Sequence, residues 1–372
     1  MQILVINCGS SSLKASLYKT DKGVCTKLID AHLKGVNDPS TGLAGIFESF
    51  AKAGFSFEPS LRVGHRFVHG GDKYRSSILL NAEVIKELEK LSWLAPLHND
   101  ICLAGIKTCI DYFGEAVPQI AVFDTAFHRT MPPIASNYAL PRDITAKYPI
   151  QHYGFHGISH AYLAQTYAKH VGQNEQTKII TLHLGNGCSM AAIRGGKSMD
   201  TSMGFTPAEG LIMSTRAGDI DAAIVEFLCV QEKKTPVEIM QILNSRSGLL
   251  GVSGISPDMK VLLDSKDDHA RLAVDMFCYR AVKYLGGYIA ALGGVEALIF
   301  SAGIGENSPE IRCDIARRME WFGIKMDDHA NSQAKGLPPG AIRKISQPDS
   351  TAALYVIATD ENAFIAQEVE LL

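Results

Sequence analysis

The hydrophobic pattern alternates short apolar runs with longer stretches in which apolar residues recur every three or four positions. Runs of about four to eight apolar residues predict buried strands, and the longer spacing predicts amphipathic helices. The predicted strands are 2–7, 13–18, 62–67, 119–123, 178–184, 297–301 and 353–358. The predicted helices are 42–53, 82–92, 99–112, 159–170, 235–245, 267–292, 308–320 and 361–370. This alternation of strands and helices predicts an α/β fold.

Two distant segments of the chain repeat one pattern. Segments 4–17 and 181–193 each run from an apolar strand through a turn rich in glycine and serine into a second strand. We interpret this repeat as a duplicated domain whose two similar halves face a common cleft. Segment 129–150 contains four prolines and is predicted to connect the halves. The length of 372 residues also favours two domains, because single cores stop growing at roughly 250–300 residues.

Several predicted strands end at a polar group. Asn7 ends the first strand, Asp124 follows the strand 119–123, segment 303–307 follows 297–301, and Asp360 and Glu361 follow the last strand. In open α/β sheets, ligands bind beyond the carboxyl ends of the strands. We therefore expect a binding site that includes these groups.

Composition narrows the class of protein. The net charge is −3 and no segment concentrates Lys and Arg, so a nucleic-acid partner is not expected. The N-terminus lacks the basic region of a signal peptide, and no apolar run reaches the roughly 18 residues of a membrane span. The eight cysteines form no CxxC pair, which indicates reduced thiols in a cytoplasmic protein.

Three loops rich in glycine suit the binding of an anion. They are 7–12 (NCGSSS), 185–187 (GNG) and 303–307 (GIGEN), and the last precedes a predicted helix. Backbone amides of such loops can approach a phosphate closely, although glycine and serine also dominate ordinary turns. Because each loop follows a predicted strand, together they indicate a nucleotide site.

Two arginines supply the complementary charge. Arg66 and Arg216 have apolar neighbours in the sequence, and a guanidinium group binds carboxylate or phosphate through two hydrogen bonds. An ion pair with a structural carboxylate is the alternative for each of them.

Two other patterns carry less weight. Segment 191–198 (AAIRGGKS) lacks the first glycine of a phosphate-binding P-loop and is not followed by a clear helix. Histidines with the spacing of zinc ligands lack the accompanying glutamate, and glycines interrupt one set. We expect neither a P-loop nor a zinc site.

Eleven blocks of the chain resemble acetate kinases, in the order of that family. They are INCGSSSLK (6–14), GHRFVHGG (64–71), APLHN (95–99), VFDTAFH (122–128), YGFHGISH (153–160), HLGNGCS (183–189), MDTSMGFTPAEG (199–210), STRAGDID (214–221), GVSGIS (251–256), FSAGIGENS (300–308) and ATDENAFIA (358–366). The blocks run through nearly the whole chain, so a chance match is excluded.

The resemblance implies the fold shared by acetate kinases, sugar kinases, Hsp70 and actin. This fold has two duplicated actin-like or ribonuclease H-like domains with a nucleotide cleft between them. Residues 1–125 and 361–372 would form the N-terminal domain, to which the C-terminal helix returns. Residues 126–360 would form the C-terminal domain, with the nucleotide and dimer contacts. The implied protein is a cytoplasmic homodimer that catalyses reversible, Mg²⁺-dependent phosphoryl transfer between ATP and acetate, with Mn²⁺ as an alternative ion.

The same resemblance implies a role for individual residues. Arg66, Arg216 and His156 would hold the carboxylate and the transferring phosphoryl group, and Asp124 would position the reacting groups. Asn7 and Glu361 would hold the metal ion. The residues implied to bind the nucleotide are Asn7, Lys14, His183, Gly185, Asn186, Gly187, Asp258, Met259, Lys260, Gly303, Ile304, Gly305 and Asn307. The residues implied to surround the methyl group of acetate are Val68, Leu97, Phe155 and Pro207.

The chain departs from the family pattern in four places. The stretch between Lys14 and Arg66 is short, Ser214 replaces a glycine, and Ala222 replaces a proline. Met259-Lys260 replaces an aromatic residue and an arginine near the adenine, which leaves the nucleotide preference open. A kinase that prefers propionate or butyrate is the nearest alternative function, and an actin-like or Hsp70-like ATPase without a metabolic role is a distant one.

Overall fold

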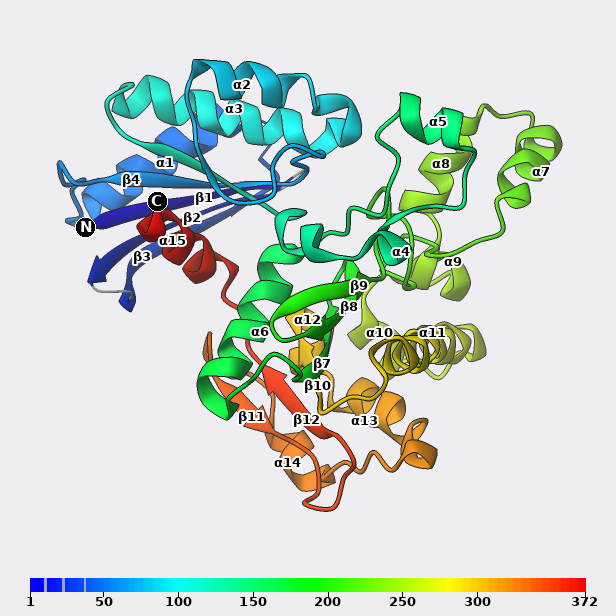
Figure 1. Cartoon of the computed structure of the whole chain (residues 1–372). Coiled ribbons are helices and arrows are strands. Elements are labelled where there is room, and N and C mark those ends of the chain that lie inside the picture. Colours follow the sequence, from blue (N-terminus) through cyan, green and yellow to red (C-terminus); the bar gives the residue numbers. More distant parts are fainter. Residues whose placement is uncertain (10–11, 22–23, 37) are drawn as a thin grey trace. The chain divides into compact units, whose positions relative to one another are not determined.

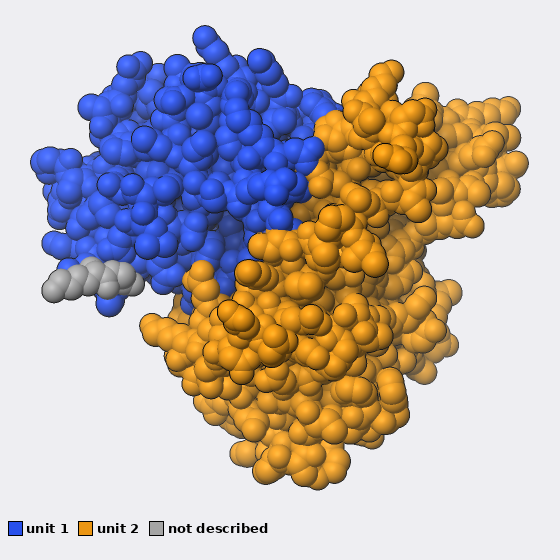
Figure 2. Space-filling model, viewed as in Figure 1, with its two compact units in different colours: residues 1–129, 157–162, 360–372 blue, residues 130–156, 163–359 orange. Residues whose placement is uncertain are grey.

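The computed structural model describes every residue except 10, 11, 22, 23 and 37, and at residues 96 and 97 it describes the backbone alone. The predicted glycine loop 7–12 therefore lies partly outside the described residues. The chain divides into two compact units, which Figure 2 colours separately. Unit 1 comprises Met1–Arg129, Gly157–Tyr162 and Asp360–Leu372, and unit 2 comprises Thr130–His156 and Leu163–Thr359.

Unit 1 is built on a six-stranded sheet with the strand order β3-β2-β1-β4-β6-β5 (Figure 1). Strands β1, β2 and β3 form an antiparallel meander, β4 and β6 run parallel to β1, and β5 is antiparallel to β6. The strands are β1 (Gln2–Cys8), β2 (Ser12–Asp21), β3 (Val24–Lys34), β4 (Arg62–Phe67), β5 (Ile78–Leu79) and β6 (Gln119–Phe123). Strands β1 and β6 are apolar runs because both of their faces are buried.

Unit 2 repeats this topology, with the strand order β11-β12-β10-β7-β8-β9. A meander of β7, β8 and β9 is again followed by two parallel strands, β10 and β12, and by the antiparallel edge strand β11. The strands are β7 (Lys178–Leu184), β8 (Cys188–Arg194), β9 (Lys197–Thr201), β10 (Ala297–Ser301), β11 (Ile342–Lys344) and β12 (Ala353–Ile357). The duplication that the two predicted hairpins indicated is confirmed.

Helices pack on both faces of the sheet in unit 1. Figure 1 shows α1 and α3 on one face and the C-terminal helix α15 on the other. Asp38 caps α1 by accepting hydrogen bonds from two backbone amides, and the apolar stripe of α1 completes the core under β1 and β2. The helical segments of this region are α1 (Pro39–Lys52), α2 (Ala82–Glu89), η1 (Ser92–Leu94), α3 (Pro96–Phe113), η2 (Ala126–Thr130) and α15 (Glu361–Leu371).

The remaining helices follow η2 along the chain. They are α4 (Pro133–Ser136), α5 (Arg142–Lys147), α6 (Gly157–Val171), α7 (Ala223–Glu232), α8 (Pro236–Ser245), α9 (Gly248–Ser253), α10 (Met259–Asp264), α11 (Asp268–Leu292), α12 (Ala302–Asn307), α13 (Pro309–Arg317), η3 (Glu320–Phe322) and α14 (Asp328–Gln333). In the part of the chain that the structure describes, no helix is both long enough and apolar enough to cross a membrane.

All of the predicted strands and helices are present, with ends shifted by a few residues. The sequence analysis missed β3 because this edge strand is largely exposed and lacks an apolar pattern. The predicted turn at 303–307 is wrong, since these residues belong to the short helix α12. The Glu306 carboxylate accepts a hydrogen bond from the Ala302 backbone amide at 2.8 Å, which closes the helical turn.

The contact between α15 and β4 generates a stability prediction. A Cβ atom at Gly64 would lie 2.6 Å from Val369 Cγ2 and 2.9 Å from Ile365 Cγ2. Gly64→Ala should therefore lower the free energy of unfolding by about 1–3 kcal/mol through overpacking. Gly45→Ala is the matched control, because an added Cβ there meets no atom within 4 Å and should stabilise α1 by roughly 0.5–1 kcal/mol. Urea unfolding of both variants tests this, and equal effects would contradict it.

Candidate active site

The carboxyl ends of the parallel strands in unit 1 bring three polar side chains together. Asn7 lies near the end of β1, Arg66 lies near the end of β4, and Asp124 directly follows β6. The three strands are neighbours in the sheet, so their ends meet at one edge. The sequence analysis expected Asn7 and Asp124 at such an edge and predicted a strand over 62–67 that contains Arg66, and the structure brings the three side chains into contact.

Arg66 is the centre of this cluster. Its Nε donates to both carboxylate oxygens of Asp124, at 3.2 and 3.1 Å, and its Nη1 donates to Asn7 Oδ1 at 3.2 Å. Asp124 is only 2% exposed. Burial alone would lower the pKa of Arg66, but Asp124 and Glu361 raise it above its ordinary value, so the guanidinium stays charged.

Glu361 completes an acidic edge around Arg66. It is the first residue of α15, whose N-cap is Asp360, and it is half-buried. The described residues contain no group of three or more His, Cys, Asp or Glu side chains that could hold a metal ion by themselves. Asn7, Asp124 and Glu361 nevertheless offer oxygen atoms only, and Mg²⁺ commonly takes one or two carboxylates together with phosphate oxygens and water. The chemistry of this donor set therefore fits Mg²⁺.

A second cluster lies at the β7–β8 hairpin of unit 2. The rings of His156 and His183 stack with centroids 4.2 Å apart, and His156 Nδ1 lies 2.8 Å from Ser189 Oγ. A Cβ atom at Gly187 would lie 3.3 Å from His156 Nε2 and 3.7 Å from Arg216 Nη1. The glycine of this turn therefore lets both side chains approach the backbone. His156 has a φ of +56°, a left-handed conformation that non-glycine residues adopt mainly where the surroundings impose it.

Arg216 differs from Arg66 in its electrostatic partners. Its Nη1 donates to the Pro207 carbonyl oxygen at 3.1 Å, and among the described residues no carboxylate lies within ion-pair distance. Burial lowers the pKa of Arg216. A partly buried guanidinium group that lacks a carboxylate is suited to binding an external anion, because the protein leaves its charge uncompensated.

Unit 2 also contains a cavity of about 610 Å³, a volume typical of small-molecule sites. Eight of the residues expected to bind the nucleotide line it, namely Gly185, Asn186, Asp258, Met259, Lys260, Gly303, Ile304 and Asn307. Asp258 caps α10 by accepting a hydrogen bond from the Lys260 backbone amide at 2.8 Å. The cavity therefore offers polar backbone, charged side chains and an apolar surface together.

Other expected residues lie elsewhere. His183, Gly187 and Gly305 do not line the cavity, and Asn7 and Lys14 belong to unit 1. Lys14 is exposed and pairs with Asn7 across the β1–β2 hairpin.

The residues expected around the methyl group are divided between the units. Val68 is buried in unit 1, Phe155 and Pro207 belong to unit 2, and the side chain of Leu97 lies outside the described residues. Their grouping into one pocket stays a prediction.

The sequence analysis missed several residues beside these clusters. The cavity is also lined by Lys335, Ser308 and Ser214, the last of which replaces a glycine of the family pattern. Ser189 contacts His156. Ser189 lies in the block HLGNGCS and could have been singled out there. No local pattern marks Lys335, since its approach to the cavity depends on the packing of unit 2.

Comparisons with known proteins place the chain in a family. A model described as the acetokinase family matches residues 32–367. The chain belongs to this family. It is 43% identical over 407 aligned residues to an acetate kinase from Solibacter usitatus (strain Ellin6076), covering 99% of this chain and 97% of that protein.

Solved structures agree with this assignment. A crystal structure of acetate kinase from Porphyromonas gingivalis superimposes on this acetokinase with a TM-score of 0.89, 37% identity and coverage of 100% and 99% of the two chains. A propionate kinase from Francisella tularensis subsp. tularensis SCHU S4 superimposes with a TM-score of 0.88, 35% identity and the same coverage. The predicted family and fold class are confirmed, and the protein is a phosphotransferase with a carboxyl group as acceptor.

The contrast between the two arginines predicts opposite effects on stability. Arg66→Ala removes the ion pair of the buried Asp124 carboxylate with Arg66 and should lower the free energy of unfolding by about 3–5 kcal/mol. Arg216→Met removes a charge that no carboxylate compensates and should change the free energy of unfolding by less than about 1 kcal/mol. Urea titration followed by circular dichroism measures both, and equal losses would contradict the contrast.

Proposed function

We propose that this acetokinase transfers the terminal phosphoryl group of ATP to acetate, reversibly, giving acetyl phosphate and ADP. The observation that carries the proposal is the partly buried Arg216, which lacks a carboxylate partner among the described residues, whereas Arg66 has one. A small carboxylate substrate would supply the missing charge. Curated relatives at 43% identity over nearly the whole chain are named acetate kinase.

The proposed reaction needs electrostatic help rather than a base. A carboxylate with a pKa of about 4 is ionised at pH 7, so its oxygen can attack the terminal phosphorus directly. A bond forms from this oxygen to phosphorus, the bond to the bridging oxygen breaks, and its electron pair leaves with ADP. The main obstacle is the approach of two anions, and positive groups placed around the transferring phosphoryl offset it.

Two arginines and a histidine are the proposed positive groups. Arg216 and Arg66 bind the carboxylate and the phosphoryl oxygens, and His156 donates a hydrogen bond to the phosphoryl in transfer. Asp124 acts by holding Arg66 in one orientation through hydrogen bonds from Nε and Nη2, and it takes no proton. The ion pair with Asp124 keeps Arg66 charged and ordered before the substrate arrives.

The nucleotide has a proposed place in the unit 2 cavity. Met259 and Ile304 offer an apolar surface to the adenine, while Asp258 and Asn307 offer polar groups to the ribose. Lys260 lines this cavity in place of the arginine expected there. His183, Gly187, Gly305, Asn7 and Lys14 would then act on the phosphates.

Mg²⁺ is the proposed metal, and Asn7 and Glu361 would hold it. When bound, it supplies positive charge to the phosphate oxygens, and Mn²⁺ accepts the same oxygen donors.

A second candidate acceptor is propionate. The propionate kinase from Francisella tularensis resembles this chain about as closely as the solved acetate kinase does. Val68, Leu97, Phe155 and Pro207 are the proposed contacts of the acyl chain, and one extra methylene in such a pocket changes binding by only about 1–3 kcal/mol. Initial rates with acetate, propionate and butyrate distinguish these acceptors.

We also propose that the protein acts in the cytoplasm. All eight cysteines are free thiols, and five of them are buried. Unpaired cysteines in this number suit a reducing compartment.

The activity prediction uses hydroxylamine to trap acetyl phosphate in a mixture of enzyme, ATP, Mg²⁺ and acetate. The wild-type protein should form the hydroxamate, and chelation of the metal should stop its formation. Arg66→Ala and Arg216→Ala should each lower kcat by roughly 10³–10⁵-fold, as loss of a charge-stabilising arginine does in other phosphoryl-transfer enzymes.

Arg142→Ala is the control, because this arginine lies exposed on α5. It should leave turnover unchanged. Near-normal turnover of both the Arg66 and Arg216 variants would contradict the proposed site.

A homodimer is the proposed assembly. Helix α7 exposes three apolar side chains at helical spacing, Ile224, Phe227 and Val230, with exposed fractions of 40%, 60% and 67%. The adjoining helix α8 exposes Val237 at 77%. Contiguous apolar surface of this kind commonly marks a protein interface, and we propose that a second copy of the chain covers it.

The assembly prediction tests this face directly. Phe227→Asp together with Val230→Asp should convert the dimer into a monomer, because the interface would then contain unpaired charges. Ile134→Asp is the control, since Ile134 is 93% exposed on a different helix and should leave the mass unchanged. Size-exclusion chromatography with light scattering measures the mass. A monomeric wild-type protein, or a dimeric double variant, would contradict the proposal.

A further inference from the structure

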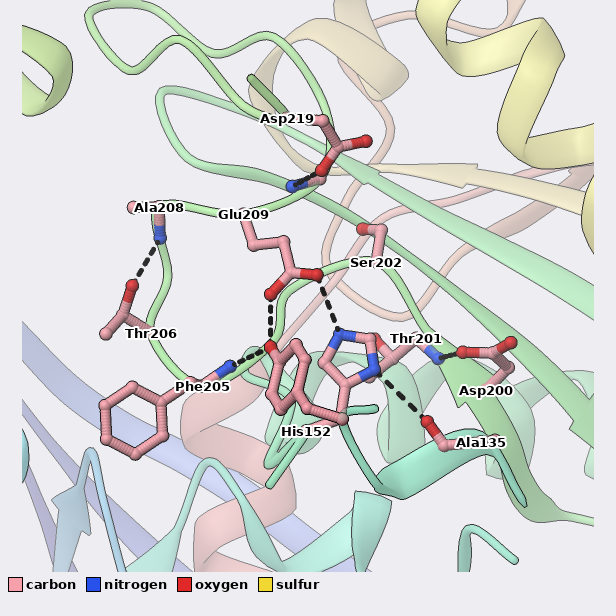
Figure 3. A network of polar contacts seen from close by, with 12 residues as sticks. Ala135, His152, Asp200, Thr201, Ser202, Phe205, Thr206, Ala208, Glu209 and Asp219 are labelled. Carbon is pink, nitrogen blue, oxygen red and sulfur yellow. Dashed lines mark hydrogen bonds and ion pairs between the residues drawn. The ribbon is translucent and has the colours of Figure 1, made fainter. Parts of the chain in front are cut away.

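A small polar network in unit 2 connects two segments that carry proposed acceptor-site residues, 152–156 and 205–209. It consists of Tyr138, His152 and Glu209, which we call the Glu209 network (Figure 3). The Tyr138 hydroxyl donates to Glu209 Oε2 and accepts a hydrogen bond from the Phe205 backbone amide at 2.8 Å. His152 Nε2 lies 3.7 Å from Glu209 Oε1, which is an ion pair when the imidazole is protonated.

The Tyr138 hydroxyl closes the turn 205–209. One end of this turn is held through the Phe205 amide and the other through the Glu209 carboxylate, and Pro207 lies at its centre. Burial, together with Glu209 as acceptor, raises the pKa of Tyr138, so the hydroxyl keeps the proton that it donates. A single hydroxyl group therefore joins the two ends of the turn.

The turn 205–209 also fixes the position of the Arg216 guanidinium group. The Pro207 carbonyl oxygen accepts the hydrogen bond from Arg216 Nη1 at 3.1 Å. Among the described residues Arg216 has no carboxylate partner. Its Nη1 bonds this carbonyl and lies 3.6 Å from the Met213 sulfur. A displacement of Pro207 would displace the guanidinium group with it.

The same network reaches the segment that carries His156. The Gly204 carbonyl oxygen, at the start of the turn, accepts hydrogen bonds from the backbone amides of Tyr153 and Gly154 at 3.1 and 3.3 Å. His152 directly precedes these residues and Phe155 and His156 directly follow them. A Cβ atom at position 204 would overlap the Glu209 carboxylate and the Tyr138 hydroxyl, so only glycine allows this approach.

The position of the turn does not depend on Glu209 alone. At its far end, the Gly210 amide donates to Asp219 Oδ1 at 2.8 Å, and Arg280 Nη1 donates to the Gly210 carbonyl at 3.0 Å (the first of these is drawn in Figure 3). The Glu209 side chain is 36% exposed, and an ion pair at that exposure contributes little to stability. Loss of Glu209 should therefore change the geometry of Pro207 more than the stability of unit 2.

We propose that Glu209 is a positioning residue for the carboxylate acceptor, acting through Tyr138 on Pro207 and through the Pro207 carbonyl on Arg216. This inference rests on the proposed function, in which Pro207 and Arg216 contact acetate. Glu209 itself touches neither substrate. Its effect is to hold an uncompensated guanidinium group in one place without neutralising the charge that binds the acceptor.

The test compares Glu209→Ala, Tyr138→Phe and the conservative Glu209→Gln. The first two remove the bond that closes the turn and should raise the KM for acetate roughly 10–100-fold, since displacement of a binding group by about 1 Å can cost that much. The KM for ATP should stay within about twofold, because the cavity proposed to bind the nucleotide has no lining residue in the turn 205–209. Glu209→Gln retains an oxygen that accepts from Tyr138 and should restore the KM for acetate to near the wild-type value.

Glu175→Ala is the matched control, because Glu175 is an exposed glutamate of the same unit, and it should leave both KM values unchanged. Thermal midpoints of all variants are recorded with the kinetics. An unchanged KM for acetate in Glu209→Ala, alongside an impaired Arg216→Ala, would overturn the inference and leave the proposed function standing. A parallel loss of stability, kcat and both KM values would also overturn it, since that result describes a structural role only. A fully active Arg216→Ala would remove the acceptor site and this inference together.

Discussion

The ion pair between Arg66 and Asp124 is the interaction on which the unit 1 cluster depends. Asp124 is almost completely buried, and a buried carboxylate requires a partner that compensates its charge. Arg66 provides this compensation and also bonds Asn7, so the ends of three adjacent strands are tied together. The guanidinium group is thereby held charged at the edge of the sheet.

The duplicated topology lets the corresponding edge of unit 2 serve a different purpose. Ser301 ends β10 where Arg66 approaches the end of β4, and its hydroxyl donates to the Ile357 carbonyl oxygen at the end of β12. Glu306 accepts from the backbone amides of Ala302 and Thr359. Hydrogen bonds between these two side chains and the backbone therefore close this edge, and burial raises the pKa of Glu306. Beside α10 and α12, unit 2 has the cavity that residues 303, 304 and 307 help to line.

The two arginines that the proposed reaction uses differ in how the protein compensates their positive charge. Arg66 is compensated and ordered before any substrate binds, while Arg216 is oriented by a carbonyl oxygen and retains its full charge for an anion. A carbonyl oxygen directs a guanidinium group without neutralising it. The polar network at the turn around Pro207 can therefore orient Arg216 and leave its positive charge uncompensated.

The fold was predictable from the sequence wherever burial imposes a pattern. The strands β1, β6 and β10 are apolar runs because both of their faces are covered, whereas the exposed edge strand β3 has no such pattern and was missed. The sequence analysis predicted a turn in place of helix α12, because this segment contains two glycines. The hydrogen bond from the Ala302 amide to Glu306, which stabilises the helix, is not visible in the sequence.

For the site, the sequence alone determined which chemical groups are present and that Asn7 and Asp124 follow parallel strands, because strand ends must meet at one edge of a sheet. It could not distinguish Arg66 from Arg216, as both are arginines with apolar neighbours. Tertiary structure alone decided that one faces a carboxylate 58 positions along the chain and the other a backbone carbonyl. It likewise decided that Tyr138 meets Glu209. Contacts at hydrogen-bond distance between remote residues are set by the packing of whole elements, and that packing leaves no local signature in the sequence.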